Sequence, residues 1–235
     1  MTKLFINGDS HTARVWGDAG PTAGDILAEK FSCEIENLAM SGGSNQRIIR
    51  TTQERLKDLN PRSTLIIIGW SSFERTEWYY GGRWHDICGD SAYAVDDDLK
   101  KRWKSHVETY QKWNDDTHEQ WRRQQDQHHA IWVFHNLLHD LGFRFLFYQG
   151  CETCFFDGCV EALLDFKLTW HDGTWAHDPY MDPSTQPWTG NSFSHWCRRQ
   201  GFKHADARNH YGADAHRAWA DYLAPLIAAK LSSLQ

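Results

Sequence analysis

A serine, a carboxylate and a histidine lie near the two ends of the chain in an order that suits acyl transfer. Ser10 follows a short apolar run at residues 3–6, and Asp206 and His210 precede the last helix-like segment. A serine hydroxyl becomes a nucleophile when a histidine accepts its proton and a carboxylate orients that histidine. We therefore expect Ser10 to attack an acyl carbonyl, His210 to act as the base and Asp206 to orient His210. Asp214 is the competing carboxylate.

A glycine-containing segment supplies candidate donors to the oxyanion of such a reaction. Residues 41–45, Ser-Gly-Gly-Ser-Asn, follow a predicted strand and open a predicted helix. Backbone N–H groups at such a point face the same edge of a parallel sheet as the serine. We expect the N–H groups of Ser10 and Gly42 to hold the oxyanion, helped by the side chains of Asn45 or Ser71. The serine hydroxyl is shorter than an amide and can rotate away, which favours Asn45.

Aromatic side chains are the candidate substrate contacts. The chain holds 13 tryptophans, and flat rings stack on ligands as readily as they fill a core or pin a loop. The residues that we expect to contact substrate are His11, Trp70, Trp170, Trp175 and Trp188.

Cysteines after the fourth predicted strand offer a weaker metal or redox motif. Cys151 and Cys154 have the C-x-x-C spacing, and Cys159 follows. Such thiols bind zinc or form a redox pair, but a fourth ligand at matching spacing is missing, so buried reduced thiols are the simpler interpretation. His135 and His139 share a helix face without an acidic partner motif, which favours a surface pair. We therefore expect no metal and no organic cofactor.

The elements that must position these residues alternate between strand and helix. Apolar runs that end at glycine or polar turns indicate buried parallel strands, and the segments between them have helical periodicity. Strand–helix–strand order over the first 69 residues predicts a parallel α/β sheet in one domain spanning residues 1–235. We expect strands at residues 3–6, 33–38, 64–68 and 143–148, and helices at 23–31, 45–59, 131–141, 191–200 and 213–234.

Two segments depart from this alternation. Residues 77–129 are rich in charge, glutamine and tryptophan, and we expect a helical insertion there that packs beside the rim of the site. Residues 157–190 are rich in tryptophan, aspartate and proline, and we expect a long loop.

Composition excludes several classes of function. The chain has 235 residues, a formal net charge of −6 and 40% hydrophobic residues, which fits a folded domain and argues against nucleic-acid binding. We find no apolar run that could span a membrane and no leader segment, so the expected location is the cytoplasm, with a place in a virion as the alternative. Six cysteines without a leader indicate reduced thiols. The oligomeric state has no signature in the sequence.

Four motifs, in order along the chain, resemble those of the SGNH or GDSL-type hydrolase family. They are Gly8-Asp9-Ser10, the segment 37–42 (Asn-Leu-Ala-Met-Ser-Gly), the segment 69–72 (Gly-Trp-Ser-Ser), and the segment 210–220 with His210 and His216 six residues apart. The segment 44–48, Ser-Asn-Gln-Arg-Ile, also resembles SGNH-like proteins that bacteriophages encode. Three positions depart from the family pattern. Ser71 stands where the third block has asparagine, Asp206 lies one position further from the histidine than usual, and Tyr211 replaces a proline.

The resemblance implies a three-layer α/β/α sandwich with a flavodoxin-like parallel sheet of about five strands. It also implies a serine esterase or deacetylase that acts on acyl esters, which we expect to be of carbohydrate type. The expected partner is thus a small-molecule or glycan ester, with no nucleic acid and no membrane. Two alternatives stay open. An O-acyltransferase would use the same chemistry with an alcohol acceptor, and a non-catalytic phage structural or glycan-binding module would keep only the fold.

Overall fold

The computed structural model describes residues 2–13, 20–87, parts of 101–112, 117–151, 192–206 and 209–232. The predicted loop at 157–190, with Trp170, Trp175 and Trp188, lies outside the described residues, as do Cys154 and Cys159. Among the described helices none is long and apolar enough to cross a membrane.

A parallel sheet of four described strands forms the middle layer. The strands are β1 (Lys3–Gly8), β2 (Glu34–Asn37), β3 (Thr64–Trp70) and β6 (Arg144–Gln149), in the order β2-β1-β3-β6. Every pairing is parallel. All residues of β3 are buried, as expected for a strand covered on both faces. The α/β class and the flavodoxin-like order of these strands are confirmed, with four described strands where about five were expected.

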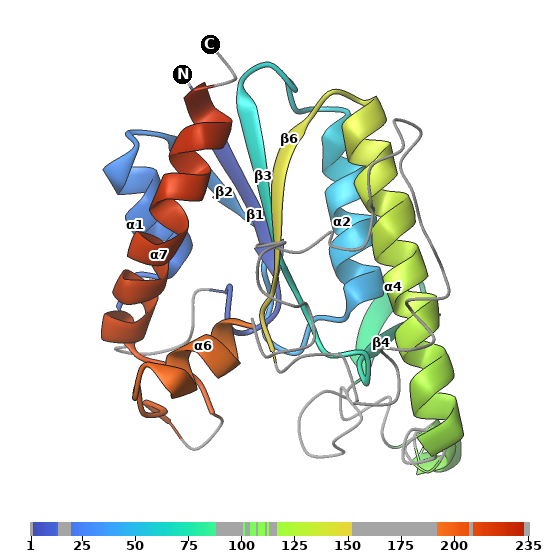
Figure 1. Cartoon of the computed structure of the whole chain (residues 1–235). Coiled ribbons are helices and arrows are strands. Elements are labelled where there is room, and N and C mark those ends of the chain that lie inside the picture. Colours follow the sequence, from blue (N-terminus) through green and yellow to red (C-terminus); the bar gives the residue numbers. More distant parts are fainter. Residues whose placement is uncertain are drawn as a thin grey trace.

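Helices cover both faces of the sheet (Figure 1). On one side lie α1 (Ala23–Lys30) and α7 (Ala213–Ser232), which pack on Leu4, Ile6, Leu65 and Ile67. On the other side lie α2 (Asn45–Leu56) and α4 (Thr117–Asp140), which pack on Phe5, Ile66 and Ile68. Successive residues of one strand thus enter opposite cores, and the result is a three-layer α/β/α sandwich.

Local signals in the sequence explain where the helices begin. Thr22 caps α1, since its side chain accepts from the Asp25 N–H and the Asp25 side chain accepts from the Thr22 N–H, a complete capping box. Ser44 caps α2 by accepting from the Arg47 N–H, and Ser192 caps α6 (Phe193–Arg199) in the same way. These caps fix the points at which the chain leaves the rim of the sheet.

The segment after β3 begins with a β-hairpin, not with helix. Strands β4 (Thr76–Tyr80) and β5 (Arg83–Ile87) pair antiparallel around Gly81 and Gly82, whose φ angles are +60° and +83°. Two glycines with positive φ form the tight turn that hairpins favour. The expectation of a helical insertion over residues 77–129 is therefore wrong at the start of this segment. Further along, residues 104–106 and 108–110 are helical, and α4 begins at Thr117.

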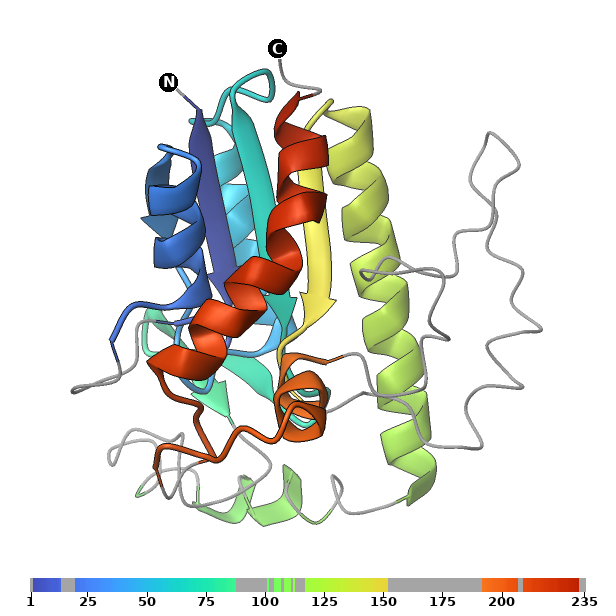
Figure 2. The same cartoon turned by 60° about the vertical axis from the view of Figure 1, so that its left-hand side comes forward.

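The carboxyl ends of the strands meet at one edge of the molecule, the lower edge in Figure 1. The hairpin lies at this edge beside the start of α2, because the Ser44 N–H contacts Asp86 and Arg50 forms an ion pair with Glu77 at 2.7 Å. Figure 2 shows α6 below the ends of the central strands, on the α7 side. The site predicted from the sequence belongs at this edge.

Candidate active site

Ser10 lies in a tight turn directly after β1. The Asp9 carbonyl accepts from the N–H groups of Thr12, at 3.0 Å, and Ala13, at 2.8 Å. The Asp9 side chain also accepts from the His11 N–H at 3.0 Å. Asp9 is fully buried and Ser10 is 5% exposed. Hydrogen bonds between the residues before and after Ser10 therefore fix its backbone.

Neighbouring strands fix this turn in place. The Asn37 side chain, at the end of β2, donates to the Thr12 carbonyl at 3.2 Å, and the Thr12 hydroxyl pairs with the Tyr148 hydroxyl of β6 at 3.0 Å. A Cβ on Gly8 would lie 2.6 Å from the Thr12 hydroxyl oxygen, so only glycine allows this close approach. The serine is thus positioned by the ends of three strands.

Asp206 and His210 are joined by two hydrogen bonds in the segment before α7. Asp206 Oδ1 accepts from the His210 backbone N–H at 3.0 Å, and Oδ2 lies 2.7 Å from His210 Nδ1. An ionised carboxylate only accepts hydrogen bonds, so Nδ1 carries the proton and Nε2 keeps its lone pair. Of the two candidate carboxylates, Asp206 and not Asp214 contacts His210 in the described residues. The pair has the geometry that a histidine base requires.

The His210 ring faces the turn that holds Ser10. Its centroid lies 5.9 Å from that of His11, which in turn lies 5.7 Å from Phe193. Burial lowers the pKa of His11 below its usual value, so the ring is neutral at pH 7. No hydrogen bond joins Ser10 to His210 in the part of the chain that the structure describes. Catalytic hydrogen bonds often close only when substrate binds.

Within the described part of the chain, two backbone N–H groups at the predicted oxyanion position have no hydrogen-bond partner. The Met40 N–H donates to the Gly8 carbonyl at 3.0 Å, which brings the loop after β2 against the end of β1. Gly42 has a φ of +79°, a conformation that favours glycine. The N–H groups of Ser10 and Gly42 make no hydrogen bond within the described ranges. They remain available as donors.

The Asn45 side chain has other partners than an oxyanion. Its Oδ1 accepts from the Ser71 N–H at 2.7 Å, and its Nδ2 donates to the Ser71 carbonyl at 3.0 Å and to Gln127 Oε1. Both amide hydrogens are engaged, and Asn45 is 3% exposed. The expectation that Asn45 supplies the missing amide donor is therefore wrong in this structure. Asn45 instead ties the start of α2 to the end of β3 and to α4.

Arg75 is a charged residue of the site that the sequence reasoning missed. Its Nη1 donates to the Ser71 hydroxyl at 3.0 Å and lies 3.4 Å from Asp9 Oδ2. The arginine thus joins the end of β3 to the turn that holds Ser10. The signal in the sequence was an arginine within five residues of the end of a buried strand, where parallel sheets place ligands.

Trp70 is a core residue, and its predicted contact with substrate is wrong. The side chain is fully buried, and its ring meets Phe147 edge-on at 5.0 Å and Phe134 at 6.1 Å. As the last residue of β3, Trp70 points into the layer between the sheet and α4. His135, expected in a surface pair, also packs edge-on against Phe145 at 4.5 Å.

Cys151 meets the turn after β1. Its thiol donates to Asp9 Oδ2, and burial raises the pKa of this thiol well above its usual value. Three atoms that could bind a metal, one each from Asp9, His11 and Cys151, lie within 4.8 Å of one another. The first cysteine of the C-x-x-C motif therefore lies against the turn that holds the candidate nucleophile.

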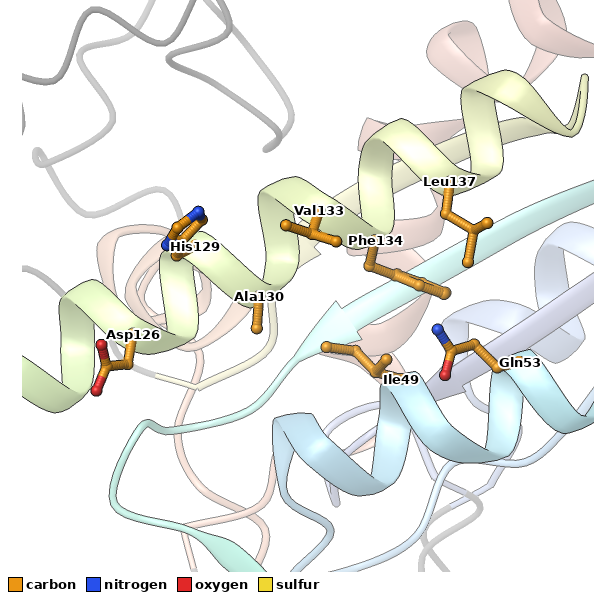
Figure 3. Close-up of a pocket in the computed structure, with 8 residues that line it drawn as sticks. All are labelled: Ile49, Gln53, Asp126, His129, Ala130, Val133, Phe134 and Leu137. Atoms are coloured by element: carbon orange, nitrogen blue, oxygen red, sulfur yellow. The ribbon is translucent and has the colours of Figure 1, made fainter.

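A separate pocket of about 400 Å³ lies between α2 and α4. Figure 3 shows Ile49 and Gln53 of α2 opposite Val133, Phe134 and Leu137 of α4. Ser10, Gly42 and His210 are not among its described lining residues, so we place the chemistry at the sheet edge.

Comparison with known proteins identifies the family but supplies no activity. Among solved structures, one similar chain is from Bacteroides fragilis NCTC 9343 and is described as a "putative acylhydrolase". It is 10% identical, the match covers 100% of this chain and 88% of that one, and the TM-score is 0.35. No curated protein matches. A family model described as "Family of unknown function (DUF6071)" matches residues 9–158, and the chain therefore belongs to this family.

Proposed function

We propose that this protein is a serine ester hydrolase. The observation that supports it most is the Asp206–His210 pair, whose ring faces the turn of Ser10 at the carboxyl ends of the strands. The pair leaves His210 Nε2 as the basic nitrogen. The geometry thus combines an oriented base with a serine held in a tight turn.

In the proposed reaction, Ser10 Oγ attacks the acyl carbonyl carbon and His210 Nε2 accepts the hydroxyl proton. The N–H groups of Ser10 and Gly42 hold the developing oxyanion. The proton then passes to the leaving alcohol, and water releases the acyl group from Ser10 by the same path. Asp206 keeps the imidazole in the required tautomer throughout.

The substrate that we propose is an acyl ester of a carbohydrate, such as an acetylated sugar. The support is the resemblance of the motifs to the SGNH family, together with two exposed aromatic rings on the hairpin. Tyr79 is 62% exposed and Trp84 is 45% exposed, and their ring centroids lie 5.2 Å apart. Exposed flat rings at the rim of a site offer stacking surfaces to sugars.

The decisive experiment is ester hydrolysis by the whole protein and two serine variants. We expect the wild type to hydrolyse p-nitrophenyl acetate, and Ser10→Ala to lose roughly 10³-fold or more in kcat. Ser63→Ala, outside the site, serves as the matched control and should keep full turnover. Retained activity in Ser10→Ala would contradict the assignment. A wild type inactive on every short acyl ester would favour a glycan-binding module. Acetyl transfer to an added sugar at the expense of hydrolysis would indicate an O-acyltransferase.

A further inference from the structure

Three side chains with metal-binding atoms converge beside the candidate nucleophile. Asp9 and His11 come from the turn after β1, and Cys151 follows β6. Their ligand atoms lie within 4.8 Å of one another. Carboxylate, imidazole and thiolate are the three ligand types that zinc uses in proteins. The cluster joins two strand ends that are not neighbours in the sheet.

The spacing of the cluster fits a single small cation. Zinc binds these ligands at about 2.0–2.3 Å with tetrahedral angles, which puts ligand atoms roughly 3.3–3.8 Å apart. The observed upper limit of 4.8 Å exceeds this by about 1 Å, a gap that rotation of the side chains can close. Three protein ligands leave a fourth position for water.

His11 supplies a second observation at this cluster. Its Nδ1 is buried without a hydrogen-bond partner, and neither ring nitrogen is hydrogen-bonded within the described residues. A buried polar nitrogen without a partner costs free energy, and a bound cation would remove that cost. The fully buried Asp9 carboxylate lies against this ring and against the Cys151 sulfur.

We propose that Asp9, His11 and Cys151 form a binding site for a divalent transition metal, with Zn²⁺ as the best match. The metal would take the place of the thiol proton that now lies between Cys151 and Asp9, and this proton would pass to solvent. It would tie the turn of Ser10 to the segment after β6. The proposal departs from the expectation of a metal-free site, and it does not depend on the ester chemistry.

Arg75 is the competing cation at this carboxylate. It lies 3.4 Å from Asp9 Oδ2, which is a long contact, whereas it donates to the Ser71 hydroxyl at 3.0 Å. The guanidinium can therefore keep its bond to Ser71 when a metal takes the Asp9 oxygen.

The test uses Co²⁺ as a spectroscopic probe on the chelator-treated whole protein. We expect one equivalent of Co²⁺ to give a thiolate charge-transfer absorption that Zn²⁺ abolishes by displacement. Cys151→Ser should remove the absorption and weaken Zn²⁺ affinity by at least about 100-fold. Cys33→Ser is the matched control and should keep both, because the Cys33 thiol donates to the Phe31 carbonyl elsewhere.

Further variants keep the proposal open to refutation. His11→Gln and Asp9→Asn preserve side-chain size, and each should weaken Zn²⁺ binding by a similar factor, with folding checked by circular dichroism. Zn²⁺ should also raise the Tm of the wild type and of Cys33→Ser, but not of Cys151→Ser. The proposal is overturned if the wild type gives no thiolate absorption, or if Cys151→Ser keeps it. Loss of the absorption in Cys154→Ser alone would equally overturn it.

Discussion

The two sides of the candidate site are built by different means. The histidine side consists of Asp206 and His210, which are four residues apart and bond to each other through both the backbone and the side chain. The arginine side consists of Asn45, Ser71 and Arg75, which come from α2, the end of β3 and the segment after it. The first side needs only local geometry, whereas the second exists only once the fold has assembled.

Both sides depart from the pattern of the resembling family, in different ways. On the histidine side, the extra residue between carboxylate and histidine is accommodated, because Asp206 still reaches Nδ1 at 2.7 Å. On the arginine side, the asparagine amide of the third block is absent, and Arg75 donates to the Ser71 that replaces it. The arginine side thus depends on long-range contacts, and the following predictions test the two sides separately.

The largest expected effect is on the histidine side. Asp206→Asn should lower kcat for p-nitrophenyl acetate by roughly 10³–10⁴-fold, because an amide at this position favours the wrong imidazole tautomer. His210→Gln should give a comparable loss. Asp214→Asn is the matched control, since Asp214 is exposed at the start of α7, and it should leave kcat unchanged. Equal losses in the two aspartate variants would remove the distinction between the carboxylates.

The next effect concerns Arg75 as a positioning residue. Arg75→Met removes the bond to the Ser71 hydroxyl and the ion pair with Asp9, so we expect about a 100-fold lower kcat with a smaller change in KM. Arg75→Lys should restore part of the rate, because it keeps the charge but replaces the fixed guanidinium nitrogen that contacts both Ser71 and Asp9 with a flexible ammonium. Arg62→Met, on the exposed turn before β3, is the control. An unchanged kcat in Arg75→Met would show that the arginine side has no part in catalysis.

Asn45 should matter for stability more than for turnover. Asn45→Ala removes both hydrogen bonds to the Ser71 backbone and leaves a buried N–H without a partner. We expect the free energy of unfolding to fall by about 2 kcal/mol. Urea unfolding measures this, with the exposed Gln46→Ala as control. A large loss of turnover with an unchanged Tm would restore Asn45 as an oxyanion donor.

The sequence predicted what depends on local pattern and missed what depends on distant partners. The cap at Thr22, the buried strand β3 and the Asp206–His210 spacing are short-range features, and each could be predicted from neighbouring residues. The role of Asn45 could not, because its partner Ser71 lies 26 residues away.

Two other errors have different causes. The β4–β5 hairpin carried a local signal, Gly81-Gly82 between aromatic residues, that the charged composition of the segment obscured. Trp70 was misjudged because a tryptophan at a strand end serves equally as core or as ligand contact, and only its contacts with Phe134 and Phe147 decide.

The smallest expected effect concerns His216, which we expect to contribute to stability and not to the chemistry of the Asp206–His210 pair. His216, in the first turn of α7, is 3% exposed and stacks on Phe193 at 5.1 Å. Burial lowers the pKa of His216 to about 4, from 6.5 in the unfolded chain. Between these two values the unfolded chain binds more protons than the folded one, so stability is full above pH 6.5 and falls as the pH drops towards 4. At pH 5.5 the loss from this one group is about 1.4 kcal/mol.

His216→Phe keeps a ring against Phe193 but removes the titrating group. We expect the free energy of unfolding of this variant to fall about 1.4 kcal/mol less than that of the wild type between pH 7.5 and 5.5. Some acid sensitivity should persist, because burial also lowers the pKa of His135 to about 4. His139→Gln, exposed near the end of α4, should behave as the wild type does. If His216→Phe instead abolished ester turnover at pH 7.5 with its stability intact, His216 would belong to the catalytic machinery.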